Sequence, residues 1–173
     1  IINTQNDAPV ASTLLEPINE SIQTDLTPGF FWAESYDPDP MDHISYTMHW
    51  WPVGMLPVIY SADTDTNSFT PVDDLSDNSR FAWMVTAKDI QGSQSNSDSS
   101  YFYTDEFPEA PSNFSTIIPE NNAEGIAPEV EFVWNQATDP DPVEEIRYQL
   151  VYSTDWQDSS TYNYSDLLED TSI

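Results

Sequence analysis

One eleven-residue stretch occurs twice in this chain, at a spacing of 102 residues. Residues 30–40 read FFWAESYDPDP, and residues 132–142 read FVWNQATDPDP. In each copy, a run of aromatic and aliphatic residues leads into an acidic turn that proline stiffens. A repeat of this length is typical of tandem domains, because the repeats of solenoids and propellers recur every ~20–50 residues. The sequence therefore predicts two copies of one domain.

Short stretches that alternate between polar and apolar residues predict an all-β domain. The clearest covers residues 43–51, where Ile44, Tyr46, Met48 and Trp50 share one face. Seven strands are predicted, at residues 10–16, 30–35, 43–51, 56–61, 68–72, 80–88 and 100–104. Seven short strands with turns between them, and no helix, are the pattern of a β-sandwich.

The order of the core residues resembles that of a fibronectin type III-like domain, a member of the immunoglobulin-like sandwiches. The residues that carry the resemblance are Trp32, Tyr46, Leu75 and the motif Phe81-x-Trp83-x-Val85-x-Ala87-x-Asp89-x-x-Gly92. It is closest to the acidic tandem repeats of long secreted surface proteins of bacteria and some archaea, in which W-x-x-x-x-DPD is a frequent signature. Phe81 stands where this family has its corner tyrosine, so the usual hydroxyl-to-backbone hydrogen bond is not expected there.

The repeat also predicts the organisation of the chain. We expect the last strand of a preceding domain plus a linker at residues 1–7, a fibronectin type III-like domain at 8–106, a linker at 107–111 and a second, C-terminally incomplete domain at 112–173. The second copy lacks counterparts of residues 72–104, so residues 147–153 are expected to present an open strand edge. Three explanations stay open: the chain is cut here, the rest is disordered, or a strand from another molecule completes the sheet.

The chain combines a large negative charge with many aromatic side chains. Its 173 residues include 31 Asp and Glu against 3 Lys and Arg, a formal net charge of −28, and 13% are aromatic. The rings can fill a core, which argues against wholesale disorder. The charge repels nucleic acid and anionic membranes, so neither a nucleic-acid partner nor direct membrane insertion is expected. It suits divalent cations, high salt or a cationic partner.

The acidic turns are the best candidates for a ligand site. In this fold the loop after the second strand lies at the same end as the loop after the sixth, which predicts that Asp37, Asp39 and Asp42 converge with Asp89. Hard oxygen ligands on a stiff loop suit Ca²⁺, which takes ~6–8 oxygens. The second copy repeats the arrangement with Asp139, Asp141 and Glu144. The alternative is that the Asp–Pro pairs form Asx-type turns, whose carboxylates only cap backbone N–H groups.

Other candidate sites concern glycans. Strand alternation sends Trp51 outward, where its ring could stack on a sugar. Sequons at Asn19, Asn113 and Asn163 could carry N-linked glycans on a secreted chain.

Catalysis is poorly supported by the sequence. There is no cysteine and there are only 4 glycines, and no Ser–His–acid spacing or phosphate-cradling loop is present. We therefore expect a non-enzymatic, extracellular structural module of a stalk, surface layer or filament. Its partners would be other copies of itself or neighbouring repeats of the same chain. The alternatives are an adhesin or glycan-binding module that recognises a cell-surface ligand, and an accessory domain of a secreted hydrolase.

Overall fold

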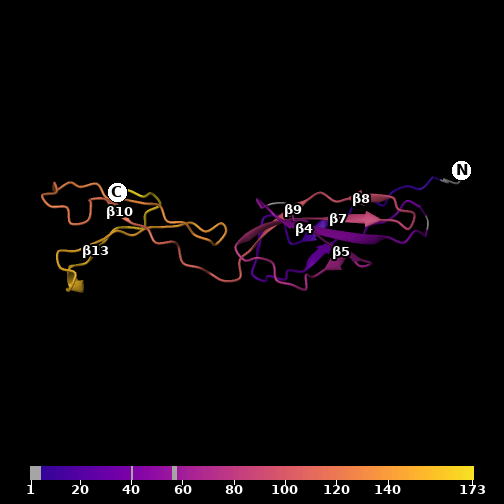
Figure 1. Cartoon of the computed structure of the whole chain (residues 1–173), viewed down its shortest axis with the longest axis horizontal. Coiled ribbons are helices and arrows are strands. Elements are labelled where there is room, and N and C mark those ends of the chain that lie inside the picture. Colours follow the sequence, from indigo (N-terminus) through magenta and orange to yellow (C-terminus); the bar gives the residue numbers. More distant parts are fainter. Residues whose placement is uncertain (1–4, 40, 56–57) are drawn as a thin grey trace. The chain divides into compact units, whose positions relative to one another are not determined.

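Two units of unequal size make up the computed structural model, which describes residues 5–39, 41–55 and 58–173 (Figure 1). Unit 1 extends to Pro108, and unit 2 spans Glu109–Ile173. The regular structure in the described residues is β, apart from one 3-10 turn, η1, at Ser159–Thr161. None of these residues belongs to a helix that could span a lipid bilayer. The expected strand at the start of the chain lies outside the described residues.

Unit 1 is a sandwich of two sheets. One sheet has the order β1 (Leu14–Glu16), β3 (Phe30–Trp32), β6 (Ser68–Phe69). The other has the order β2 (Ser21–Gln23), β9 (Ser100–Thr104), β7 (Ser79–Lys88), β4 (Ser45–Pro52), β5 (Tyr60–Thr64), and β8 (Gln94–Asn96) also pairs with β7. Neighbouring strands are antiparallel except for β2 and β9, which are parallel. This topology is an immunoglobulin-like, fibronectin type III-like sandwich, which confirms the predicted fold class.

Alternation along β4 builds the core of unit 1. Tyr46, Met48 and Trp50 are buried on one face, and Trp32 of the facing sheet packs edge-on against Tyr46 with ring centroids 5.6 Å apart. Trp32 has no exposed surface, and its repeat partner Trp134 is only 5% exposed. The two tryptophans that define the repeat are therefore core residues, because each large ring removes a large apolar area from water.

Several predicted strand boundaries are wrong. Of the first two predicted strands, only Leu14–Glu16 and Phe30–Trp32 form a ladder, and it contains a register shift between Leu14 and Glu16. The strand predicted at residues 56–61 is replaced by β5 at Tyr60–Thr64, and residues 56 and 57 lie outside the described part. Two short strands, β2 and β8, were not predicted, because their sequences SIQ and QSN carry no apolar alternation.

Unit 2 repeats part of this architecture. Its strands pair as β10 (Thr116–Ile118) with β11 (Val133–Trp134) and as β12 (Val151–Tyr152) with β13 (Asn163–Tyr164). The pairing of Thr116 with Trp134 repeats that of Leu14 with Trp32. Trp134, Ala137 and Tyr148 form a small buried core in this unit.

Candidate functional site

The two Asp-Pro-Asp turns have the same internal hydrogen bond. In unit 1 the Asp39 backbone N–H donates to Asp37 Oδ1 at 2.8 Å, and in unit 2 the Asp141 N–H donates to Asp139 Oδ1 at 3.0 Å. A carboxylate that accepts from the N–H two residues on forms an Asx turn, which proline supports by fixing the backbone φ. The first aspartate of each motif thus shapes the turn, as the capping interpretation predicts.

The second aspartate of each motif holds the incoming chain. Asp39 Oδ2 accepts the backbone N–H of Asp7 at 2.7 Å. Its counterpart Asp141 accepts the N–H of Glu109 at 3.1 Å to Oδ2 and 3.3 Å to Oδ1. Asp7 and Glu109 are themselves 102 residues apart, so each unit fixes the segment that enters it by the same contact.

Three carboxylates gather beside each turn. In unit 1, oxygen atoms of Asp37, Asp42 and Asp89 all lie within 4.8 Å of one another, while Asp39 is turned toward the incoming chain instead. In unit 2, the matching group is Asp139, Asp141 and Glu144. Within the described part of the chain, the buried Asp37 Oδ2 has no hydrogen-bond partner. Calcium binding by these groups stays a prediction.

Asp89, in the loop after β7, is the third carboxylate of the unit 1 cluster. Its Oδ1 accepts the backbone N–H groups of Gln91, Gly92 and Ser93 at 2.5–2.9 Å, and its Oδ2 accepts Asn6 Nδ2 at 2.8 Å. Burial opposes the charged form, but these four hydrogen bonds outweigh burial and lower the pKa of Asp89. Gly92 permits the turn, since its φ of 101° is one that L side chains rarely adopt. The hydrogen bonds therefore hold the Asp89 carboxylate in place and favour its charged form.

A buried tyrosine hydroxyl accepts a backbone N–H just before each turn. The Ser35 N–H donates to the Tyr46 hydroxyl at 2.9 Å, and the Ala137 N–H donates to the Tyr148 hydroxyl at 2.9 Å. Both donors, Ser35 and Ala137, lie two residues before the first aspartate of the motif. Sequence reasoning missed this contact, although Tyr46 and Tyr148 are also 102 residues apart. Phe81, at the position of the family's corner tyrosine, is buried in the core.

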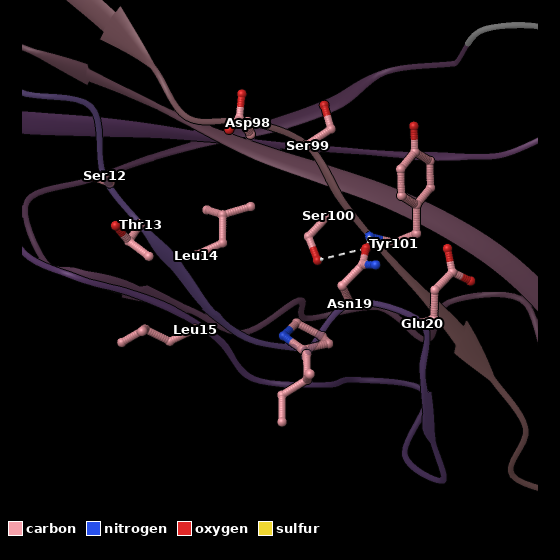
Figure 2. Close-up of a pocket in the computed structure, with 12 residues that line it drawn as sticks. Ser12, Thr13, Leu14, Leu15, Asn19, Glu20, Asp98, Ser99, Ser100 and Tyr101 are labelled. Carbon is pink, nitrogen blue, oxygen red and sulfur yellow. Dashed lines mark hydrogen bonds between the residues drawn. The ribbon is translucent and has the colours of Figure 1, made fainter.

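The candidate glycan sites are widely scattered. Trp51 is half-buried on β4, where it lies opposite Ala82 of β7. Asn19 is one of the residues that line a cavity of about 590 Å³ (Figure 2). Its Oδ1 accepts the Tyr101 N–H at 3.0 Å. The other two sequon asparagines, Asn113 and Asn163, are exposed. Glycan stacking and glycosylation stay predictions.

Comparison with known proteins finds only a distant likeness to solved structures. Neither protein-family models nor curated proteins match this chain. Among solved structures it is similar to the crystal structure of chicken CNTN1 FN1–FN3 domains, with a TM-score of 0.48 and 13% identity. The match covers 99% of this chain and 57% of that one. Likeness at this level gives no basis for transferring a function.

Proposed function

We propose that this chain is a non-catalytic, extracellular spacer, part of a stalk, surface layer or filament built of acidic sandwich units. The observation that carries the proposal is the repeated contact between the incoming chain and the second aspartate of each turn, Asp39 or Asp141. Sandwiches of this class occur widely in cell-surface proteins, where they act as structural or recognition modules. A spacer needs joints that resist bending, and a hydrogen-bonded chain at each joint supplies such resistance.

The outgoing chain of unit 1 is anchored as well. The Asp105 N–H donates to the Gln23 carbonyl at 2.9 Å, and the Glu106 N–H donates to Asp77 Oδ1 at 2.9 Å. Since Glu109 is already bonded within unit 2, only residues 107–108 lie between the two sets of anchors. A tether this short leaves little freedom, because the number of conformations rises with the number of unrestrained residues.

Residual dipolar couplings of the two units test the spacer role. If the joint is stiff, both units report the same degree of alignment, because they tumble as one body. Inserting Gly-Gly-Ser between Phe107 and Pro108 should make the two alignments differ. The same insertion in the exposed loop at residues 73–74 is the matched control and should change nothing. Independent alignment of the units in the unmodified chain would refute the proposal.

We further propose that the acidic clusters bind Ca²⁺ and stiffen the turns that hold the incoming chain. Three anions within 4.8 Å repel one another, and a divalent cation would remove that repulsion. Within this cluster, the Oδ2 of Asp37 has no hydrogen-bond partner among the described residues and is open to a cation. Carboxylate oxygens are the ligands that Ca²⁺ prefers, with water completing a shell of ~6–8.

Thermal unfolding with millimolar Ca²⁺, against NaCl at matched ionic strength, tests this second proposal. A ligand that binds only the folded state raises its stability, by ~2.7 kcal/mol at one hundred times its dissociation constant. Asp37→Asn with Asp42→Asn should abolish the increment in unit 1. The control is Asp73→Asn with Asp74→Asn, which removes the same charge from an exposed loop. A Ca²⁺ increment in the unfolding of unit 1 that survives the first pair would show the site to be wrong.

A further inference from the structure

Unit 1 contains a cavity of about 600 Å³ that lies apart from the acidic cluster. Residues of β5 and β6, which are edge strands of the two facing sheets, contribute to its lining. Because β6 is only two residues long, it cannot cover the whole inner face of the five-residue β5. The segment after β6, at residues 71–76, lines a further part. The cavity is therefore a gap between the two sheets that no side chain of the described residues fills.

Aromatic rings make up much of the lining. Trp50 stacks on Tyr60 with ring centroids 5.5 Å apart, and Phe69 lies 5.3 Å from Trp50 on the other sheet. Tyr60 pairs directly with Trp50 across the ladder, so both rings are on the inner face of their sheet. Tyr60 is nevertheless 46% exposed. A ring that faces inward and is still half exposed leaves apolar surface for a ligand to cover.

Exposed apolar side chains surround these rings. Met55, Val58 and Val72 all line the cavity and are exposed, and Val72 is 93% exposed. Contiguous apolar surface of this kind marks a ligand-binding groove or an interaction site. Ligand sites are typically cavities of ~300–1,000 Å³ that have a mostly apolar lining and a few polar groups. The size and lining of this cavity fit that description.

The charged groups of the lining are all negative. Asp73 and Asp74 line the cavity, and both are exposed. Among the described residues that line it, none is a lysine, an arginine or a histidine. The chain as a whole carries a formal charge of −28, so an anionic ligand is repelled. A cation is attracted both by the two carboxylates and by the faces of the aromatic rings.

We propose that this cavity binds a hydrophobic organic cation, such as a quaternary ammonium group attached to an apolar or aromatic body. The apolar body packs against Trp50 and Phe69, and the cationic head lies near Tyr60 and the carboxylates of Asp73 and Asp74. Both parts are needed, because the rings reward apolar area and the carboxylates reward positive charge. This site makes unit 1 a recognition module in addition to a spacer.

Three small probes added to the full 173-residue chain test the proposal. Benzyltrimethylammonium has the ring and the charge, benzyl alcohol has the ring alone, and tetramethylammonium has the charge alone. NMR of the isotope-labelled chain should show that benzyltrimethylammonium shifts the amides of Ala62 and Leu75, which line the cavity. It should bind roughly two- to thirtyfold more tightly than benzyl alcohol, the range that a cation over aromatic rings supplies. The amides of Gly92, beside the acidic cluster, and Ala137, in unit 2, should not shift.

Surface variants test the part of the carboxylates without disturbing the core. Asp73→Asn with Asp74→Asn should weaken the binding of benzyltrimethylammonium roughly two- to tenfold, since each removed charge acts in a largely aqueous setting. Asp65→Asn with Asp98→Asn is the matched control. It removes the same charge from exposed positions that do not line the cavity, and it should leave the affinity unchanged.

A filling variant tests the location. Ala62 pairs with the buried Met48, so its side chain is on the inner face of the sheet, and it lines the cavity. Ala62→Leu places three more carbon atoms there and should weaken binding at least fivefold. A thermal melt first establishes that this variant folds, and the surface variants decide the question if it does not.

Three results would overturn the proposal. Benzyl alcohol that binds as tightly as benzyltrimethylammonium would show an apolar site with no preference for a cation. Tetramethylammonium that shifts the same amides as strongly, or an equal loss of affinity in both pairs of charge variants, would show general attraction to an acidic chain. Sedimentation that reveals a dimer, with the Ala62 and Leu75 amides shielded in it, would make a second copy the occupant. These results do not bear on the spacer role or on calcium binding.

Discussion

Replacing Tyr46 by Phe removes one oxygen atom and leaves a buried donor without an acceptor. The Ser35 N–H donates to that hydroxyl at 2.9 Å, and Ser35 is only 8% exposed, so water cannot easily replace the lost partner. An unsatisfied buried donor costs ~1–3 kcal/mol. Each kcal/mol lowers the melting temperature of a domain of ~60–100 residues by ~4–8 °C. Tyr46→Phe should therefore lower the unfolding temperature of unit 1 by several degrees or more.

The repeat supplies an internal check on this reasoning. The Ala137 N–H donates to Tyr148 at the same distance of 2.9 Å, so Tyr148→Phe should lower the unfolding transition of unit 2 instead. Calorimetry follows the two transitions separately, as a chain with two units requires. Tyr36→Phe is the control, because Tyr36 is 66% exposed and surface changes stay within ~0.5 kcal/mol. If Tyr46→Phe costs no more than Tyr36→Phe, the tyrosine does not support the turn.

Two further predictions concern solution conditions. Burial raises the pKa of Tyr46, an effect that the Ser35 N–H reduces and the charge of Glu34 reinforces. The stability that comes from a raised pKa is fully present below the unfolded-state pKa of ~10 and is lost as the pH rises through the folded-state pKa. Unit 1 should therefore unfold at a lower temperature at alkaline pH. Tyr46→Phe should make the unfolding temperature depend less on pH in this range, which thermal melts at several pH values would show. The net charge of −28 makes the chain repel itself. Raising NaCl from ~0.01 M to ~1 M shortens the Debye length from ~30 Å to ~3 Å, so the unfolding temperature should rise, and an unchanged value would mean that self-repulsion is unimportant.

Alternation and repetition made the sandwich predictable from the sequence. Phe81, Trp83, Val85 and Ala87 keep a period of two through residues 80–88, and β7 spans Ser79–Lys88. β2 could not be found in this way, because it forms through parallel pairing with β9, some 80 residues further on, and not through its own pattern. Whether a short polar segment becomes a strand depends on the strands that it pairs with, and the local sequence pattern does not show which these are.

The candidate site was predictable only in outline. The convergence of Asp37 and Asp42 with Asp89 follows from the ends at which loops of a sandwich lie. The position of Asp39 does not, because its carboxylate is turned by the N–H of Asp7, and the path of that segment is set by the whole fold. The support from Tyr46 was missed for a similar reason, since a hydroxyl contact leaves no trace in apolar periodicity.

Amide hydrogen exchange across the whole chain tests most directly whether the two units share one architecture with a free edge on the second. In unit 1 the Val53 N–H donates to the Arg80 carbonyl on β7, so odd-numbered residues of β4 face β7. The amides of Thr47 and His49 should be strongly protected. Their counterparts 102 residues on, Gln149 and Val151, should exchange almost as fast as in an unfolded chain. Equal protection of the two pairs would contradict the account.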